Sequence, residues 1–458
     1  MIFQSNFSRS IKSIFVPVLA VVLFAADTFA QENSDRPADH VILISIDGFR
    51  PDFYQHAVRS APMLQYMAKH GSQADGVRGI FPSLTYPSHT TLVTGTFPAK
   101  HGIYYNSPFE PEGQTGRWYW EYDAITTETL WSVAGDNGLV TASIGWPVTV
   151  DAPIDYNLPE IWDPEGEWVP AVRRHTTPDG FFEEIETYAT GKMSGDMLSG
   201  RHFTREDRVG AAAAYIIGEY QPNLMTIHIV ATDFYQHRYG MEHHLVDRAL
   251  AAADRAIARM VEATDEARIL DRTAFIISGD HGFTNISARV APNVWLTEAG
   301  LMEDRPDRGD WRATFHAGGG SAFLHLRDPD DTEAAEMARE IVENQPPSVK
   351  RLFRVVDRDE LDRIGANPEV PFALTATSIA GMSGASSGNA VRSATGGTHG
   401  HFPDFKSMET GFVAWGSGVA ESVHISQIGM EDIAPLAAEL LGLKFSEPDG
   451  IVIPGLLR

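Results

Sequence analysis

The stretch VILISIDG at residues 41–48 decides the fold class. Its first six residues are mostly apolar and rich in branched side chains, which is typical of a strand buried on both faces of a parallel sheet. Similar runs occur at Leu224–Val230 (LMTIHIV) and Ala274–Ser278 (AFIIS). Each run leads into a polar turn that contains an aspartate, so the chain predicts three buried strands that end in carboxylates.

A fourth strand is predicted at Gly411–Trp415, and helical patterns separate the strands. The alternation of strands and helices predicts an α/β fold with a mostly parallel central sheet and helices on both faces. In such folds ligands gather at the carboxyl ends of the strands, so the aspartate turns are suspected to form a site. The helical patterns cover Arg205–Tyr220, Leu245–Arg268 and Glu431–Leu441.

The 458 residues allow up to three domains, but we expect a single catalytic domain over residues 40–458. Residues 151–201 are rich in Pro, Trp, Tyr and acidic residues and show weak periodicity, so they are interpreted as a small inserted lid. Residues 378–398 are dominated by Gly, Ser and Ala and are predicted to form a flexible loop.

The N-terminus has the features of a cleavable signal peptide over residues 1–30. Arg9 and Lys12 precede the apolar run Ile14–Ala26, and Thr28-Phe29-Ala30 offers a small-residue cleavage site. A retained anchor is the alternative. Residues 31–39 read as a polar lead-in. With no other long apolar stretch, the mature chain is expected to have no transmembrane segment and to be periplasmic or secreted.

Composition excludes several classes of protein. Lys and Arg number 36 against 61 Asp and Glu, giving a formal net charge of −25, which argues against a stable nucleic-acid complex. The chain has no cysteine, which excludes disulfides, thiolate catalysis and sulfur-ligated metals. A metal site would need nitrogen and oxygen ligands.

Six residues supply such ligands near the predicted strand ends. Taken singly, each has an ordinary alternative as a helix cap, a turn residue or a surface contact. Together, three carboxylates and three imidazoles suit two divalent cations, with zinc the first choice and another divalent transition metal acceptable at one site. The six are Asp47, Asp233, His237, Asp280, His281 and His399.

A hydroxyl nucleophile is available in FPSLTYPSH at residues 81–89, which leads into a helix expected to start near Thr90–Thr94. A hydroxyl at a helix N-terminus benefits from free N–H groups and the positive end of the helix dipole. Thr85 is the candidate, and Ser83 and Ser88 are rivals on local chemistry alone.

In this order, the motifs resemble the nucleotide pyrophosphatase/phosphodiesterase family of the alkaline phosphatase superfamily, from about Val41 to Gly450. The resemblance implies an alkaline-phosphatase-like fold and an exported hydrolase of phosphodiesters or nucleotides with two Zn²⁺ ions. It rests on ISIDGFRPDF, FPSLTYPSHTTLVTGTFPAKHGIYYN, ATDFYQHRYG, SGDHGF and GGTHGHFPD.

The resemblance also implies roles for individual residues. One zinc is expected on Asp233, His237 and His399, and the other on Asp47, Asp280 and His281, with Thr85 as oxygen ligand and nucleophile. Thr85 is expected to form a covalent phospho-threonine that water then hydrolyses. Asn106 corresponds to an amide that binds a phosphoryl oxygen, and Tyr86 to an aromatic residue that stacks on a nucleobase.

The main alternative is a threonine-dependent phosphomonoesterase on the same fold. A related monoesterase branch carries a Lys and an Arg after the strand that follows the nucleophile helix, whereas TASIGWPVTV at 141–150 has neither, which favours a diester. Arg50, Lys100 and Arg117 are the cations that could still reach the site. A sulfatase is disfavoured because residue 85 is Thr, and an inactive binding protein because the ligand set is intact. The oligomeric state stays open.

Overall fold

The structure, a computed structural model, describes residues 36–164, 167–377 and 379–458. The predicted signal peptide lies outside the described residues. The centre of the described chain is an eight-stranded sheet. In sheet order its strands are β18 (Val423–Ile425), β2 (Ser72–Ala74), β17 (Phe412–Gly416), β7 (Thr273–Ser278), β1 (His40–Ile46), β6 (Leu224–Ile229), β4 (Thr141–Ile144) and β5 (Tyr156–Leu158).

The four strands expected from the sequence are all present in this sheet. β7, β1, β6, β4 and β5 run parallel, and Ile44 of β1 lies opposite Ile227 of β6 and Ile277 of β7. β17 differs in direction, because it pairs antiparallel with both β7 and β2. The sheet is therefore large and mixed, with a parallel centre, and the α/β prediction is confirmed.

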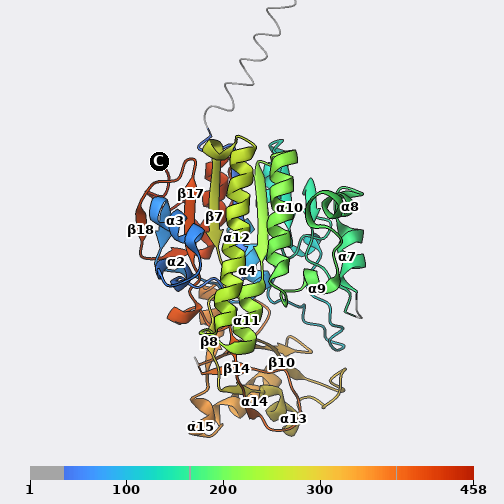
Figure 1. The fold of residues 1–458 in the computed structure, drawn as a ribbon. Coiled ribbons are helices and arrows are strands. Elements are labelled where there is room, and N and C mark those ends of the chain that lie inside the picture. Colours follow the sequence, from blue (N-terminus) through green and yellow to red (C-terminus); the bar gives the residue numbers. More distant parts are fainter. Residues whose placement is uncertain (1–35, 165–166, 378) are drawn as a thin grey trace, which may run out of the picture. The chain divides into compact units, whose positions relative to one another are not determined.

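Helices cover both faces of the sheet, as predicted. Alternate residues of β1 face opposite ways: Ile42 and Ile44 pack in the core under α10 and α12, while Val41 and Leu43 pack in the core under α4, α6 and α17. Figure 1 shows α10 and α12 side by side across the sheet. The first face carries α2 (Asp52–Gln55), α3 (Pro62–His70), α10 (Thr204–Tyr220), α11 (Ala231–Tyr239) and α12 (His244–Glu266), and the second α4 (Thr85–Thr94), α6 (Leu130–Asp136) and α17 (Ile433–Leu440).

Residues 151–201 contribute more than the predicted insertion. β5 is an edge strand of the central sheet and pairs parallel with β4. Short helices follow it, and their apolar side chains join the core on the α10 face. The sequence did not predict this strand, because three residues are too few to show the apolar/polar alternation of a strand. The helices are α7 (Trp168–His175), α8 (Phe181–Ile185), the π-helix η2 (Glu186–Thr190) and α9 (Gly195–Leu198).

A second, antiparallel sheet was not anticipated. Its order is β10 (Ala313–Gly318), β11 (Ser321–Leu326), β13 (Phe372–Ala376) and β12 (Phe353–Asp357), and it has a hydrophobic core of its own. This antiparallel module includes the helices α13 (Pro292–Glu298), α14 (Thr332–Glu343), α15 (Pro347–Lys350) and α16 (Arg358–Arg363). In Figure 1 its elements lie below the central sheet, beyond α11 and β8 (Thr284–Asn285).

The predicted loop at 378–398 is corrected by the structure. Among its described residues it holds three short strands, β14 (Ala380–Met382), β15 (Val391–Ser393) and β16 (Gly397–Thr398). β14 and β15 pair with β9 (Ala288–Val290), and β16 pairs with β8. Such strands are hard to predict from sequence, because Gly and Ser give no hydrophobic pattern and the strands are defined here by backbone pairing.

The remaining short elements connect these layers. No helix among the described residues has the length and apolar character needed to cross a bilayer. The connecting elements are β3 (Val77–Arg78), α5 (Pro98–His101), η1 (Tyr122–Ala124), η3 (Leu270–Arg272), η4 (Lys406–Met408), β19 (Ile428–Gly429) and η5 (Met430–Asp432).

Candidate active site

The three aspartates meet at the carboxyl end of the parallel strands. Asp47 follows β1 directly, Asp280 comes two residues after β7, and Asp233 lies in the first turn of α11, which follows β6. Because β6, β1 and β7 are neighbours in the sheet, their ends converge at one edge. The structure thus brings the three aspartates together at the sheet edge where the sequence placed them.

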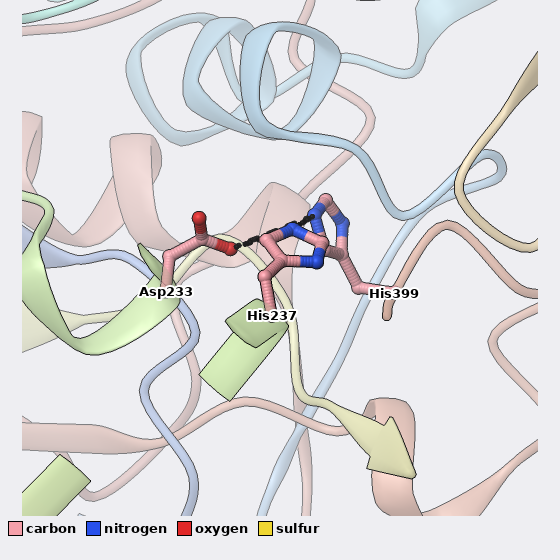
Figure 2. Close-up of side chains that lie close together, drawn as sticks. All are labelled: Asp233, His237 and His399. Carbon is pink, nitrogen blue, oxygen red and sulfur yellow. Dashed lines mark hydrogen bonds and ion pairs between the residues drawn. The ribbon is translucent and has the colours of Figure 1, made fainter. Parts of the chain in front are cut away.

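Asp233, His237 and His399 form a tight group (Figure 2). Asp233 and His237 are one helical turn apart on α11, and the His237 Nε2 lies 3.2 Å from Asp233 Oδ1. His399 follows β16 and brings its Nε2 to 3.1 Å from that of His237 and 3.6 Å from Asp233 Oδ1. Pairing of β16 with β8 places His399 here, 162 residues along the chain from His237.

The backbone fixes which nitrogen of each imidazole faces the centre. His237 Nδ1 donates to the carbonyl of Gly397 (3.0 Å) and His399 Nδ1 to that of Ser83 (2.9 Å). The two Nε2 atoms are left facing each other 3.1 Å apart, a geometry that a shared proton or a bound metal ion would stabilise. Metal-bound histidines commonly donate their other ring nitrogen to a carbonyl in this way.

The pKa values of the two histidines differ for physical reasons. Burial lowers the pKa of His399 well below its ordinary value, and the neighbouring His281 and His237 lower it further. Burial opposes the charged form of His237 too, but the Asp233 carboxylate outweighs it and raises the pKa of His237. His399 is therefore a neutral imidazole, the form that binds metals.

The second group surrounds Thr85. The His281 Nε2 lies 3.0 Å from Asp280 Oδ2, 3.3 Å from Asp47 Oδ1 and 3.5 Å from Thr85 Oγ1. Asp280 Oδ1 accepts hydrogen bonds from the backbone N–H groups of Gly48 and His281, both at 3.0 Å. These bonds hold Asp280 so that its other oxygen faces His281.

Asp233 belongs to both groups. One ligand atom from each of Asp47, Asp233 and His281 lies within 4.8 Å of the others, and the same holds for Asp233, His237 and His399. The division expected from the sequence assigned Asp233 to one cation alone. The six predicted ligands come together in the structure, but Asp233 lies between the two groups.

The unpaired oxygens show that this pocket fits divalent cations. Asp47 Oδ1, Asp233 Oδ1 and Asp280 Oδ2 are buried without a hydrogen-bond donor. Burial raises the pKa of Asp47, and the charges of Asp233 and Asp280 raise it further. Three carboxylates crowded in low dielectric are costly unless a cation neutralises them. Carboxylate and imidazole donors are those that zinc and related metals prefer.

Thr85 is the first residue of α4, so the helix begins five residues earlier than predicted. Leu84 is the N-cap and offers no side-chain cap. Pro87 is tolerated in this first turn because its missing N–H would have no partner there. Thr85 is 8% exposed and lines a cavity. The two alternative nucleophiles, Ser83 and Ser88, do not line this cavity. Ser83 is buried and donates to the His401 carbonyl, and Ser88 is fully buried.

Asn106 and Tyr86 lie beside the nucleophile candidate. The backbone N–H of Tyr86 donates to Asn106 Oδ1 at 2.9 Å, which orients the amide and turns its NH₂ group outward as the donor. The structure contradicts the predicted role of Tyr86 as an aromatic residue that stacks on a nucleobase. Its side chain is 0% exposed, its hydroxyl donates to Glu160 (3.1 Å), and Trp118 packs against its ring.

Glu160 and His228 are site residues that sequence reasoning missed. His228 is buried in β6. Its Nε2 lies 3.2 Å from Asp47 Oδ2 and its Nδ1 3.0 Å from Glu160 Oε2. The imidazole thus connects a predicted metal ligand to the carboxylate that holds Tyr86. The one available signal was a polar residue near the carboxyl end of a buried strand.

Two cavities adjoin the site. The larger, of about 400 Å³, is lined by Asp47, Thr85 and Asp233 and by many apolar side chains from residues 158–212. The smaller, of about 290 Å³, is lined by Asn106, His237 and His399. Trp118 lines both cavities. Trp118, Trp162 and Phe182 are aromatic residues in the lining of the larger cavity.

Comparison with known proteins identifies the family. A profile of the type I phosphodiesterase / nucleotide pyrophosphatase family matches residues 41–387, which is most of the chain. The chain belongs to this family. The predicted resemblance is therefore confirmed.

Among family members, the mouse ectonucleotide pyrophosphatase/phosphodiesterase family member 3 is 23% identical over 90% of this chain and 43% of its own length. A venom phosphodiesterase of the rattlesnake Crotalus durissus collilineatus is 23% identical over 90% of this chain and 45% of its own. The chain thus spans less than half the length of these two relatives. The human family member 5 structure has a TM-score of 0.66 at 20% identity, covering 92% of this chain and all of that one, so the fold is shared.

Proposed function

We propose that this chain is an exported, two-zinc phosphodiesterase or nucleotide pyrophosphatase that works through a covalent phospho-threonine at Thr85. One observation carries the proposal: the Thr85 hydroxyl lies at the open N-terminus of α4, 3.5 Å from His281 Nε2, in a cavity that Asp47 and Asp233 also line. Nucleophile and metal-ligand candidates therefore share one cavity.

The metals would be held by the two groups described above. Asp233, His237 and His399 would hold one, and Asp47, Asp280 and His281 the other, together with the Thr85 oxygen; Asp233 also lies within reach of the second group. Bound divalent ions would lower the pKa of the threonine hydroxyl and stabilise charge on the attacking and leaving oxygens.

Thr85 carries the covalent step. Its hydroxyl loses a proton to solvent, and an oxygen lone pair forms a new bond to phosphorus while the bond to the leaving oxygen breaks, with its electron pair going to that oxygen. Water then attacks the phospho-threonine in line, the Thr85–phosphorus bond breaks, and Thr85 regains a proton. The backbone N–H of Thr85, at the start of α4, and the Asn106 amide donate to phosphoryl oxygens.

The preference for a diester over a monoester rests on the three cations that the sequence left as candidates, while Arg201, Arg205, Arg208 and Arg289 line the two cavities. A monoester carries a second negative charge that needs an extra cation. Arg50, Lys100 and Arg117 are the cations that remained candidates, and each has carboxylate partners elsewhere: Asp52 and Glu242, Asp449, and Glu121, respectively. None of the three lines either cavity.

The relatives support a nucleotide as the substrate. One solved structure is that of an inactive variant of murine family member 5, with a single threonine replaced by alanine, in complex with AMP. The aromatic lining of the larger cavity suits a nucleobase, with Trp118 as the candidate platform in place of Tyr86. We also propose that the segment 167–201, which supplies much of that lining, acts as a lid.

Substrate preference tests the proposal. We would compare kcat/KM of the zinc-loaded protein for the nitrophenyl ester of thymidine monophosphate and for nitrophenyl phosphate, with Thr85→Ala as the control. A large preference for the diester that disappears in the variant is expected. A preference for the monoester would support the alternative, a threonine-dependent phosphomonoesterase. Export is checked separately: the N-terminus of the periplasmic or secreted protein should be Gln31.

A further inference from the structure

The two cavities beside the site differ in charge. The larger cavity is lined by the carboxylates of Asp47, Glu160 and Asp233 as well as by three arginines. Among the described residues, the smaller cavity is lined by no carboxylate at all, and Arg289 is its only Lys or Arg. This is notable in a chain with 61 acidic residues and a net charge of −25.

Arg289 is a cation without a counter-charge. It lies on β9, and its Nη1 donates to the carbonyl of Met382 at 3.0 Å. It forms no ion pair with a carboxylate in the described parts of the chain, whereas many other arginines do. Partial burial lowers the pKa of its guanidinium, and its charge acts on the nearby His237. Desolvating an unpaired charge is costly, so this arginine suggests an anionic ligand.

The rest of the smaller cavity offers donors for such an anion. Its lining includes the Asn106 amide, Ser107 and Thr398, and the Thr398 hydroxyl is buried without a hydrogen-bond partner in the described parts of the chain. A planar guanidinium together with amide and hydroxyl donors matches the oxygens of a phosphoryl group. A cavity of about 290 Å³ is sufficient for a phosphate or pyrophosphate with some water.

The direction of the reaction decides which half of the substrate this cavity holds. In an in-line displacement the leaving oxygen departs opposite the attacking one. Thr85 lines the larger cavity and does not line the smaller. The smaller cavity is lined instead by His237 and His399, from the group farther from the nucleophile. A leaving oxygen stabilised on the side of His237 and His399 would therefore lie toward the smaller cavity.

Resting on the proposed function, we infer that Arg289 is a specificity-determining residue that binds a negatively charged phosphoryl group on the leaving side of the substrate. The preferred substrate is then a phosphoanhydride, whose leaving group is phosphate or pyrophosphate, rather than an ester of a neutral alcohol. When Thr85 attacks, the bond from phosphorus to the bridging oxygen breaks, and its electron pair leaves with the anion that Arg289 holds.

Two substrates with the same retained group test this inference. Thymidine triphosphate releases pyrophosphate, whereas the nitrophenyl ester of thymidine monophosphate releases an aryl group that is uncharged before cleavage. For Arg289→Gln, the ratio of kcat/KM for the triphosphate to that for the ester should fall at least about tenfold, the effect of losing one charge-assisted hydrogen bond. Arg289→Lys should recover part of the ratio, because it keeps the charge but loses the planar fork.

Arg392→Gln is the matched control, because Arg392 lies opposite Arg289 in the β9–β15 pair but is exposed and does not line the cavity. Its ratio should equal that of the unchanged protein. Binding gives a second readout without turnover: in zinc-loaded Thr85→Ala protein, adding Arg289→Gln should weaken binding of thymidine triphosphate more than that of thymidine monophosphate.

The outcomes separate this inference from the proposed function. If the unchanged protein hydrolyses the nitrophenyl ester but Arg289→Gln lowers kcat/KM for both substrates equally, the assignment of Arg289 is wrong while the phosphodiesterase stands. If the unchanged protein hydrolyses neither substrate, the proposed function itself fails. An equal fall of the ratio in Arg392→Gln would mean that general surface charge, not the cavity, attracts the triphosphate.

Discussion

The rings of His281 and His399 stack with their centroids 3.4 Å apart and their planes 9° apart. His281 belongs to the group around Thr85, and His399 to the group around His237. The stack joins the two groups mechanically, since neither imidazole can shift without moving its neighbour. Two cations bound here would therefore be positioned relative to each other by the protein, which in-line displacement requires.

Metal removal should lower both activity and stability. Without cations, the carboxylates of Asp47, Asp233 and Asp280 have only neighbouring imidazoles, at 3.0–3.3 Å, as their nearest basic groups in the described parts of the chain. Metal present at a hundred times its Kd contributes about 3 kcal/mol to the free energy of unfolding. Chelation should therefore abolish hydrolysis and lower Tm, with both restored by zinc. Metal analysis should find two ions per chain and fewer in His399→Ala; two tightly bound ions in that variant would contradict the ligand assignment.

Thr85→Ala should reduce kcat for diesters by about a thousandfold or more, because the covalent step is lost. Thr85→Ser should retain part of the activity, since the hydroxyl stays at the start of α4. Ser88→Ala serves as the control, because the Ser88 hydroxyl is buried and has no hydrogen-bond partner among the described residues. Phospho-threonine trapped by rapid acid quench should map to Thr85. Label on Ser83 or Ser88 instead would show that the wrong hydroxyl was chosen.

His228→Gln and Glu160→Gln should weaken metal binding by about ten- to a hundredfold, the usual effect of removing a residue that orients a ligand. The physical reason is that His228 contacts Asp47 Oδ2 and is itself held by Glu160. Competition with a chelator measures the affinity directly. Tyr86→Phe removes only the hydroxyl that donates to Glu160 and should change the metal affinity less. Unchanged affinity in His228→Gln would reduce this histidine to a packing role.

Stability should fall as the pH drops below about 6.5. Burial lowers the pKa of His316 to about 4 and that of His325 to about 3. The unfolded chain binds protons at both histidines below their ordinary pKa, whereas the folded protein stays neutral there. Their contribution is therefore complete above about 6.5 and is lost as the pH falls through their folded values. Urea unfolding at pH 7 and pH 5 measures the difference.

His325→Gln should flatten this pH dependence, even if it also lowers stability at pH 7. His325 packs face to face on Phe109, and its Nε2 lies 3.0 Å from the Tyr105 hydroxyl. If the free energy of unfolding of this variant still falls as much from pH 7 to pH 5 as that of the unchanged protein, the acid sensitivity arises from other groups.

The central strands could be predicted because burial on both faces leaves a continuous apolar run, as in β1 and β7. The same rule located Asp47 and Asp280, since strand ends in a parallel sheet share an edge. The antiparallel module was missed although β11 is as long as β7, because polar residues interrupt its apolar runs, as in SAFLHL of β11. The local sequence GGTHG does not predict β16, because the position of this strand is fixed by its pairing with β8.

The sequence indicated which residues lie near the site better than which of their side chains are buried. Tyr86 and Trp118 are both aromatic and close to the nucleophile, and the sequence cannot tell which faces the cavity. The early start of α4 turns Tyr86 into the core toward Glu160, while Trp118 is left at the wall between the cavities. Similarly, His228 looks like any core histidine until β1 and β6 are placed in register.

The late arrival of His399 has a consequence for biosynthesis. Most of the ligand set has been synthesised by residue 281, but the chain must complete the antiparallel module before β16 can pair with β8 and deliver the last imidazole. A nascent polypeptide therefore cannot close its metal pocket until nearly nine-tenths of its 458 residues have been made. If the chain is exported unfolded, as proposed, metal loading would follow passage through the membrane, and the metal supply of the destination compartment would decide which ion is bound.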